Sequence, residues 1–399
     1  MAADKRPLRI LMILDNCYPA LRGGGAESQV RTLALYLKNL GHRVTILTPR
    51  VPHGRQQSIE RYEGVPVRRL EYPLVRGVAS LVLWAKLIAF LWRRRKRYDA
   101  WHVHIVHHFG TIAVAMGDKV GVPVVAKFSG QWELQGGLLA EGGSPLMRYM
   151  RHLLRRASAY QAISQSIAAT ARERDLPADR IVVLPNAVDL RRFSVHERPL
   201  EPDRPLTFVY AGRLQVHKGL DTLITAWAKA FGPSSGHKLI LAGAGEDESR
   251  LRALAESLGV IHTFEFTGFT NEIETVLARG DVAVLPSLIE GLSNTLLEYM
   301  SSGLPVIASR VSGSEDFVIP GRNGWLFPVR DVDALTACLK ESATLPREEL
   351  RRLGRQSRAD VEARAGIANV VGRMLALYRG VAPREIGSAP AAMPVREGG

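Results

Sequence analysis

The sequence has little cysteine, no long apolar run and no excess of acidic residues, and each shortage excludes a class of protein. Its 399 residues include two cysteines, Cys17 and Cys338, which are too few for a disulfide framework and too far apart for a zinc site. We therefore expect a reducing compartment, the cytoplasm. No stretch reaches the ~20 apolar residues of a membrane-spanning helix. The N-terminus, MAADKRPLRI, lacks the apolar core of a signal peptide.

The chain is longer than one hydrophobic core supports, because a single core rarely grows beyond about 250–300 residues. Its formal net charge is +14, and the first half holds this excess. Residues 1–195 carry 30 Lys+Arg against 14 Asp+Glu, whereas the remainder carries 23 against 25. This asymmetry indicates that one half faces a polyanion, either nucleic acid or an anionic membrane. We find no interleaved basic and aromatic motif and expect no nucleic-acid partner.

Short apolar runs alternate with helical patterns in both halves of the chain. In the first half we expect strands at 8–14, 43–48, 100–105, 123–126 and 160–163, with helices such as 26–40 and 111–120 between them. In the second half we expect strands at 207–211, 238–242, 264–267, 281–285 and 305–308, and helices at 220–231 and 246–258. Because parallel strands need crossover helices, this alternation predicts an α/β protein with two parallel sheets.

A stretch rich in proline and charge, residues 194–205, is typical of a linker. It separates an N-terminal domain, residues 1–193, from a C-terminal domain, residues 206–360. The tail, residues 381–399, is rich in small residues and proline, and we expect it to be disordered. Open α/β sheets bind ligands beyond the carboxyl ends of their strands, so we expect the ligand in a cleft between the two domains.

Two loops between a strand and a helix have residues suited to an anion. In GGGAES, residues 23–28, glycines allow close approach of the backbone, and the helix start supplies N–H groups; a flexible turn is an equal explanation. In GRLQVHKG, residues 212–219, Arg213 and Lys218 bracket the loop after a strand. The planar guanidinium group of arginine and the compact ammonium group of lysine suit a diphosphate. The alternative is an ordinary basic loop exposed to solvent.

A third motif, SLIEGLSNTLLEYM, has one glutamate in a loop and another on the following helix. Glu298 can accept hydrogen bonds from vicinal hydroxyls, as an acidic residue does for ribose in dinucleotide folds. The backbone N–H groups of Gly291, Leu292 and Ser293 lie at a helix start and suit phosphate or sugar oxygens. An ordinary helix surface charge would explain Glu298, but it does not explain why Glu290 precedes glycine in the loop.

Together these segments resemble the glycosyltransferases of the GT-B fold, in particular family 4 (glycosyl transferases group 1). EGLSNTLLEYMSSGLPVIAS resembles the Glu-x7-Glu signature of its retaining members, and GRLQVHKG resembles the GR…KG segment. VLPNAVDLRRF, residues 183–193, resembles the domain-crossing segment, with Ala187 in place of the usual glycine, and GGGAES resembles the N-terminal glycine loop. The resemblance extends to about Tyr378.

The resemblance implies two Rossmann-like domains with parallel sheets that face each other across an interdomain cleft. It also implies retention of configuration, no required metal or other cofactor, and a C-terminal helix, residues 361–380, that packs back toward the first domain. Its site residues would be Arg213, Lys218, Gly24 and Gly25 for the donor diphosphate, Glu298 for the ribose, and Glu290, Gly291, Leu292 and Ser293 for the donor sugar.

Two histidines, His102 and His104, alternate on a predicted strand and share one face. A metal site is disfavoured because no Cys, Asp or Glu lies nearby at metal-binding spacing. The simpler explanation is that both histidines are ordinary residues of the core or the surface, without a catalytic role. The resemblance favours His104 as a catalytic group beside the reacting sugar, together with Glu290, and His102 is the rival.

The segment VASLVLWAKLIAFLWRRRKRYD, residues 78–99, joins an apolar run to five consecutive cations. It is too short to span a bilayer. It is either a buried crossover helix with a solvated basic end or an interfacial helix that inserts Trp84 and Trp92. In the second case the membrane contacts would be Trp92, Arg93, Arg94, Arg95, Lys96 and Arg97. Residues 148–157 add four arginines at helical spacing.

The sequence thus predicts an enzyme that moves a sugar from a nucleotide-diphosphate donor to a glycan or lipid-linked acceptor. A UDP-sugar is favoured as donor, and a GDP-sugar is possible. We expect a cytoplasmic protein, with peripheral attachment to the cytoplasmic face of the membrane as an option. The alternatives are a nucleotide-sugar epimerase or hydrolase, and a basic membrane-binding module with an inactive donor cleft.

Overall fold

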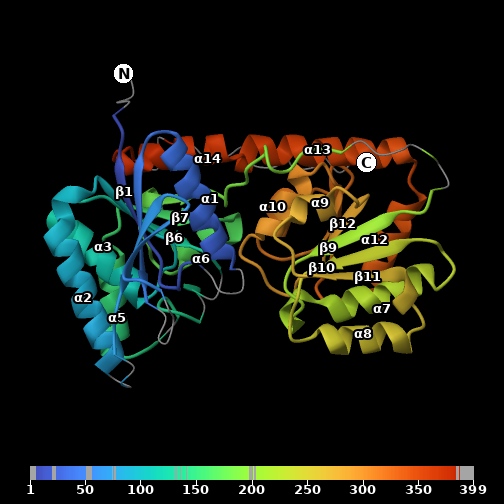
Figure 1. Cartoon of the computed structure of the whole chain (residues 1–399), viewed down its shortest axis with the longest axis horizontal. Helices are drawn as coiled ribbons and strands as arrows, with labels where there is room; N and C mark the ends of the chain where they lie inside the picture. Colours follow the sequence, from blue (N-terminus) through green and yellow to red (C-terminus); the bar gives the residue numbers. More distant parts are fainter. Residues whose placement is uncertain are drawn as a thin grey trace. The chain divides into compact units, whose positions relative to one another are not determined.

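The computed structural model describes residues 6–19, 24–50, 56–73, 75, 78–130, 133–134, 136–140, 142–196, 201, 204–382 and 386. These residues form two compact units (Figure 1). One unit contains the described residues up to Ala187 and those from Ile367 onward, and the other is Val188–Gly366. The division after Ala187 precedes the predicted linker, 194–205, of which 197–200 and 202–203 lie outside the described residues. Most of the predicted tail, 381–399, also lies outside them.

The first unit is built on an eight-stranded sheet in the order β3-β4-β2-β1-β5-β6-β7-β8. Its strands are β1 (Arg9–Ile13), β2 (Arg43–Pro49), β3 (Ile59–Tyr62), β4 (Val65–Leu70), β5 (Ala100–Val103), β6 (Val124–Phe128), β7 (Ala159–Ala162) and β8 (Ile181–Val183). All neighbours are parallel except the edge hairpin of β3 and β4. The sequence analysis missed β3, β4 and β8.

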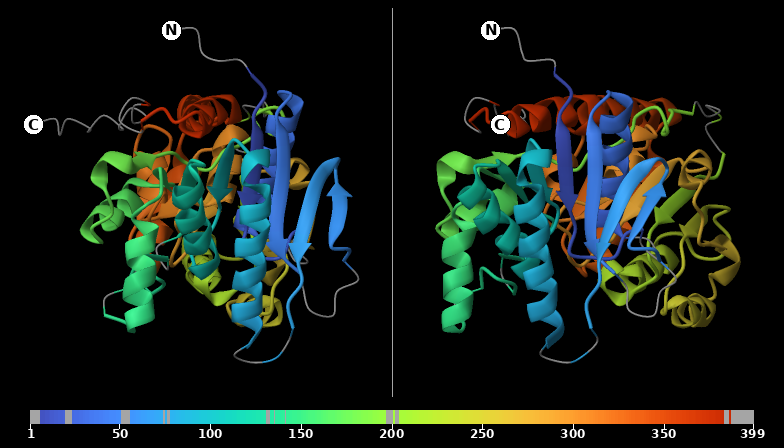
Figure 2. Two further views of the ribbon diagram at one scale, coloured as in Figure 1. Left: turned by 90° about the vertical axis from the view of Figure 1, so that its left-hand side faces the viewer. Right: turned by 60° about the vertical axis from the view of Figure 1, so that its left-hand side comes forward.

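Helices cover both faces of this sheet. Helices α1 (Gly25–Asn39) and α14 (Ile367–Tyr378) lie on one face, and α2 (Val78–Arg94), α3 (His108–Val120) and α5 (Pro145–Leu154) lie on the other (Figures 1 and 2). The short helix η1 (Arg95–Arg97) extends α2, and α6 (Gln165–Glu173) and η2 (Ala178–Arg180) lie between β7 and β8 in the sequence.

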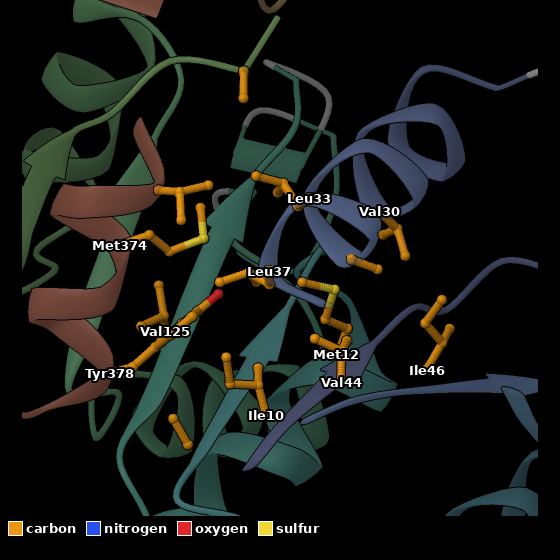
Figure 3. Close-up of a cluster of buried hydrophobic side chains, with 14 of the residues drawn as sticks. Ile10, Met12, Val30, Leu33, Leu37, Val44, Ile46, Val125, Met374 and Tyr378 are labelled. Atoms are coloured by element: carbon orange, nitrogen blue, oxygen red, sulfur yellow. The ribbon is translucent and has the colours of Figure 1, made fainter. Parts of the chain in front are cut away.

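The hydrophobic core between the sheet and α1 follows from two repeating patterns of apolar residues in the sequence. Alternate residues of the strands point to this face, and apolar residues of α1 recur every three or four positions. Figure 3 shows Ile10, Met12, Val44, Ile46 and Val125 from the strands beside Val30, Leu33 and Leu37 from α1 and Met374 and Tyr378 from α14. All of these side chains are buried. Each contributes roughly 1.5–3 kcal/mol to folding, so the C-terminal helix is an integral part of the first unit.

The second unit is a six-stranded parallel sheet in the order β11-β10-β9-β12-β13-β14. Its strands are β9 (Thr207–Ala211), β10 (Lys238–Ala242), β11 (Phe264–Gly268), β12 (Val282–Leu285), β13 (Val306–Ser309) and β14 (Gly324–Phe327). Its helices are η3 (Val216–Lys218), α7 (Leu220–Phe231), α8 (Glu248–Ser257), η4 (Ile261–Thr263), α9 (Ile273–Leu277), α10 (Asn294–Ser301), α11 (Ser314–Phe317), α12 (Val332–Thr344) and α13 (Arg347–Ala365). The predicted pair of Rossmann-like domains is confirmed, although β14 was not anticipated.

Among the described residues, no helix is both long enough and apolar enough to cross a membrane.

Candidate active site

The loop between β9 and α7 lies at the carboxyl edge of the second sheet. It runs from Gly212 to Gly219, with Arg213 near its start and Lys218 in η3. Gly219 has φ +68°, and a Cβ at this position would collide with the carbonyl oxygen of Pro286. Leu288 N–H donates to the His217 carbonyl at 2.9 Å. Glycine therefore lets this loop press against the segment that follows β12.

This close approach brings Lys218 into contact with Glu290. The Nζ atom of Lys218 lies 2.6 Å from Oε1 of Glu290, and the Ser287 hydroxyl donates to the same oxygen at 2.8 Å. The two side chains are only 16% and 13% exposed. Two residues predicted to share a site are thus a partly buried ion pair, in which each charge compensates the other.

Arg213 contributes a second cation to the same loop. Its carbonyl accepts a hydrogen bond from the buried Tyr210 hydroxyl at 2.9 Å. Its exposed guanidinium has no hydrogen-bond or ion-pair partner among the residues that the structure describes. The pKa of nearby His217 is lowered by burial and then by Lys218 and Arg213. Glu290 and Asp247 oppose this lowering of the pKa, and Lys218 is already paired with Glu290, so the charge that this loop offers to an anion is chiefly that of Arg213.

Glu298 lies in the middle of α10, whose first turn is capped by the Ser293 hydroxyl accepting from Leu296 N–H at 3.4 Å. Burial raises the pKa of Glu298 to a net value of about 7, with Arg192 opposing the rise and Glu274 adding to it. Arg192 is itself paired with Glu274 at 2.8 Å. Glu298 is thus a partly enclosed carboxyl that is close to half ionised at neutral pH, unlike an ordinary surface charge.

Tyr299 fixes α10 against the end of β9. Its hydroxyl oxygen accepts from Ala211 N–H at 2.5 Å, and the ring is fully buried. The sequence analysis missed this contact, as well as the Arg192–Glu274 pair, because neither has a recognisable spacing.

The start of α10 is enclosed by a neighbouring turn. The Gly291 carbonyl accepts from the Ser312 hydroxyl at 2.9 Å, and Leu292 and Ser293 are buried. Gly313 has φ +77°, and a Cβ there would come within 2.7 Å of the Gly291 oxygen. The sugar-binding role of Gly291, Leu292 and Ser293 stays a prediction. The turn at 312–313 packs against the start of α10, and the sequence motif gave no indication of this contact.

In the first unit, two of the three glycines of GGGAES open α1 as expected. Gly24 is the N-cap and Gly25 is the first helical residue, whereas Gly23 lies outside the described residues. The Glu27 carboxylate folds back beside Gly24, where a Cβ would collide with it. The diphosphate contact of Gly24 and Gly25 stays a prediction.

The two histidines lie at the carboxyl end of β5 and are fully buried. Nδ1 of His102 lies 2.6 Å from the Tyr378 hydroxyl, so α14 fixes this ring. The ring of His104 lies 4.0 Å from that of His102 with a tilt of 31° between the ring planes, and its nitrogens have no hydrogen-bond partner within the described chain. Burial lowers the pKa of His102 to about 3 and that of His104 well below its usual value, so both rings are neutral.

Glu133 is a residue that the sequence analysis did not identify. Its carboxylate accepts from Val106 N–H at 2.8 Å, Ser129 N–H at 2.6 Å and Gly130 N–H at 3.1 Å. The Ser129 hydroxyl donates to the His104 carbonyl at 2.6 Å. Glu133 therefore ties the loop after β6 to the loop after β5. Burial raises its pKa to about 8, while the three N–H donors and then Lys127 oppose the rise.

Within the described residues, no group of three or more His, Cys, Asp or Glu side chains could hold a metal ion. A separate pocket of about 70 Å³ opens at the amino edge of the second sheet, opposite to Arg213. Its lining includes Arg204, Arg347 and Arg351. It is not part of the site described above.

The chain is similar in sequence to known glycosyltransferases. Residues 23–192 match the family described as Glycosyltransferase Family 4, and residues 192–360 match Glycosyl transferases group 1. WcaL of Salmonella typhimurium is 31% identical over 219 residues, which are 53% of this chain and 54% of that protein. The matched region is thus about half of that relative. The GDP-mannose-dependent alpha-mannosyltransferase of Mycolicibacterium smegmatis is 27% identical over 90% of this chain and 93% of its own length.

Solved structures share the fold. Sucrose-phosphate synthase of Thermosynechococcus elongatus has a TM-score of 0.75 at 21% identity, over 93% of this chain and 98% of that one. Anabaena Alr3699/HepE in complex with UDP has a TM-score of 0.74 at 19% identity, over 92% and 98%. The two family matches adjoin each other along the chain, and both units are doubly wound parallel sheets. The chain therefore has the GT-B fold, and its two halves are similar to two glycosyltransferase families.

Proposed function

We propose that this enzyme transfers a sugar from a nucleoside-diphosphate donor to a glycan or lipid-linked acceptor with retention of configuration. The observation that carries the proposal is the convergence of Arg213, Lys218 and Glu290 at the carboxyl ends of β9 and β12. A UDP-sugar is the first candidate donor and a GDP-sugar the second.

The two cations suit the charge that develops during the reaction. Breaking the bond between the sugar and the diphosphate leaves negative charge on the leaving phosphate, and fixed cations nearby stabilise it. Arg213 offers a planar fork and Lys218 a point charge. No step requires a metal or another cofactor, and the β-phosphate itself would accept the proton of the acceptor.

The Lys218–Glu290 ion pair supports a partner exchange on donor binding. A diphosphate would compete with Glu290 for the Lys218 ammonium group, because it carries more charge than one carboxylate. The Glu290 carboxylate, still held by Ser287, would then accept hydrogen bonds from hydroxyls of the transferred sugar. Glu290 would thus orient the sugar, which is a positioning effect on the rate.

Further contacts complete the proposed site. Ionised Glu298 would accept hydrogen bonds from the ribose hydroxyls, and Gly24 and Gly25 would approach the diphosphate. His104, whose ring is neutral, would act as a hydrogen-bonding group beside the reacting sugar without gaining a charge. Its nitrogens lack partners within the described chain, but its ring is fully buried, so this role requires the groups that cover the ring to move on donor binding.

The relatives support both nucleotides. Alr3699/HepE has been solved with UDP and with UDP-glucose, whereas two mycobacterial relatives are named as GDP-mannose-dependent enzymes. WcaL is named for colanic acid biosynthesis, which supports a role in polysaccharide biosynthesis. The two free cysteines support a reducing, cytoplasmic location.

The test is a product assay with purified enzyme, a panel of UDP- and GDP-sugars, and glycan and lipid-linked acceptors. Mass spectrometry should detect a glycosylated acceptor, and NMR should show the anomeric configuration of the donor in the product. Glu290→Ala serves as the inactive control. Free sugar or an epimerised donor as the sole product would instead establish a hydrolase or epimerase.

A further inference from the structure

Helix α2 exposes an apolar stripe along one of its faces. Only Leu87 and Leu91 are buried among its residues. Val78, Leu81, Ile88 and Trp92 are 46%, 62%, 42% and 47% exposed, and Ala85 is exposed between them. The spacing of these five residues is three, four, three and four, which places them on one side of the helix. The apolar composition of α2 is therefore not explained by packing in the core.

Helix α5 adds a second exposed apolar surface beside the first. Leu146 and Tyr149 are 49% and 60% exposed and lie one turn apart. Helices α2 and α5 both pack against α3, and Figure 2 shows the three helices side by side. The exposed residues of α2 and α5 thus belong to the same helical layer of the first unit.

The charges on α2 and α5 themselves have one sign, whereas α3 carries the exposed Asp118, which is paired with Arg156 at 3.2 Å. No Asp or Glu occurs between Glu71 and Asp99, or between Glu141 and Glu173. Arg93 in the last turn of α2, Lys96 and Arg97 in η1, and Arg148 on α5 are all exposed. Clustered exposed cations next to an apolar stripe are typical of helices that lie in the headgroup region of an anionic bilayer.

We propose that α2 and α5 form a docking surface for an anionic phospholipid bilayer. The stripe from Val78 to Trp92 would enter the interface, and Arg93, Lys96 and Arg97 would contact lipid phosphates. At about 1.5 Å per residue, the 17-residue helix is too short to span the bilayer at right angles with its basic end in place, so it would lie in the membrane plane.

The predicted membrane contacts differ in how far they are exposed. Trp84 is half-buried and stacks on His108 at 5.6 Å, so it is not part of the exposed stripe. Arg94 and Arg95 are also partly buried, with Arg94 above the Phe90 ring and Arg95 donating to the Trp92 carbonyl at 2.6 Å. Trp92, Arg93, Lys96 and Arg97 remain as the exposed contacts.

A bilayer is favoured over a second copy of the chain for an electrostatic reason. A two-fold interface pairs the same patch from both subunits, so two copies would bring clustered arginines and lysines against each other. Anionic lipid headgroups instead supply the opposite charge to every exposed cation. The positive charge of this surface therefore favours an anionic bilayer over a second copy of the chain.

Co-sedimentation with lipid vesicles tests the proposal on the full-length protein. Wild type should bind vesicles of phosphatidylglycerol and phosphatidylcholine at low salt, and it should bind pure phosphatidylcholine far less. In 1 M salt, where the screening length falls to about 3 Å, binding should weaken strongly. The variant Arg93→Gln/Lys96→Gln/Arg97→Gln should bind roughly a hundredfold less tightly, because each cation near an anionic surface contributes about a factor of five.

A matched control removes three exposed cations from the second unit, Lys229→Gln/Lys238→Gln/Lys340→Gln. It loses the same net charge and should bind as wild type does. A second variant, Leu81→Ser/Ile88→Ser/Trp92→Ser, should bind at least tenfold less tightly with all its charges intact. Because these side chains are exposed, the melting temperature and UDP binding should not change in any variant, so failure here is separable from failure of the proposed enzyme activity.

Three results would overturn the proposal. They are equal binding of wild type to anionic and neutral vesicles, unchanged binding of the serine variant, and a wild-type dimer that the serine variant converts to monomers. The last result would assign the stripe to a second copy of the chain.

Discussion

The environment of Glu298 predicts a pH-dependent affinity for the donor nucleotide. Its pKa is about 7 in the ligand-free protein, chiefly because of burial. Only the ionised form accepts hydrogen bonds from both ribose hydroxyls, so nucleotide binding favours loss of the proton. With a pKa of 7, the ionised fraction falls about tenfold between pH 8 and pH 6, and the Kd for UDP should rise by about the same factor, equivalent to roughly 1.4 kcal/mol.

Isothermal titration calorimetry with UDP at several pH values measures this effect. The phosphate also gains protons in this range, and Glu298→Gln is the control because it keeps that contribution and removes the carboxyl. The variant should bind UDP more weakly than wild type at pH 8, and the difference should shrink toward pH 6. Equal pH profiles for wild type and variant would refute a carboxylate contact with the nucleotide.

The same group predicts a change in stability with the opposite pH dependence. Its pKa is raised above the ordinary value of 4.5, so the folded protein binds this proton more tightly than the unfolded chain does. The stabilisation is complete below pH 4.5 and is lost as the pH rises through 7. The difference amounts to at most about 3 kcal/mol, reduced by the solvent contact that the side chain retains. Denaturant unfolding of Glu298→Gln should therefore show a flatter profile between pH 5 and pH 8 than wild type shows.

Other residues give further predictions. Lys218→Ala and Glu290→Ala should each lower kcat by two or more orders of magnitude with an unchanged circular dichroism spectrum, and near wild-type turnover would exclude the residue from the site. Gly219→Ala should lower the melting temperature and weaken UDP binding, because its φ of +68° and its contact with Pro286 leave no room for a methyl group; unchanged calorimetry would contradict this. Glu133→Gln cannot accept all three N–H groups, so it should destabilise the protein by roughly 1–3 kcal/mol in denaturant unfolding, and no loss would show that this carboxylate does not secure the two loops.

Most of the fold follows from the order of apolar runs, because buried parallel strands need continuous apolar residues and crossover helices. The elements that were missed have weaker patterns. The hairpin of β3 and β4, IERYEGVPVRRL, is largely polar because β3 is an exposed edge strand. Strand β8 has only three residues, and β14, GWLF, begins with glycine, a residue that is depleted in strands.

The site residues that follow directly after a strand could be predicted from the sequence. Arg213, Lys218, Glu290 and Glu298 follow β9 or β12, and the carboxyl ends of these adjacent parallel strands meet at one edge of the sheet. The Lys218–Glu290 ion pair depends instead on the close approach that Gly219 permits, which no spacing encodes.

The first unit shows the same limit more clearly. Glu133 and Tyr378 act through contacts with residues far away in the sequence, Val106 and His102. The neutral state of His104 likewise results from complete burial, and its sequence neighbours gave no indication of it.

The central claim is that the loop between β9 and α7 binds the diphosphate of a nucleotide sugar. Calorimetric titration of UDP and GDP into wild type and Arg213→Ala/Lys218→Ala tests it most directly, with uridine and guanosine as ligands that lack phosphate. We predict that at least one diphosphate binds wild type and that the double variant binds it at least a hundredfold more weakly while it melts at a similar temperature. Equal affinity of a folded double variant for the diphosphate would contradict the claim.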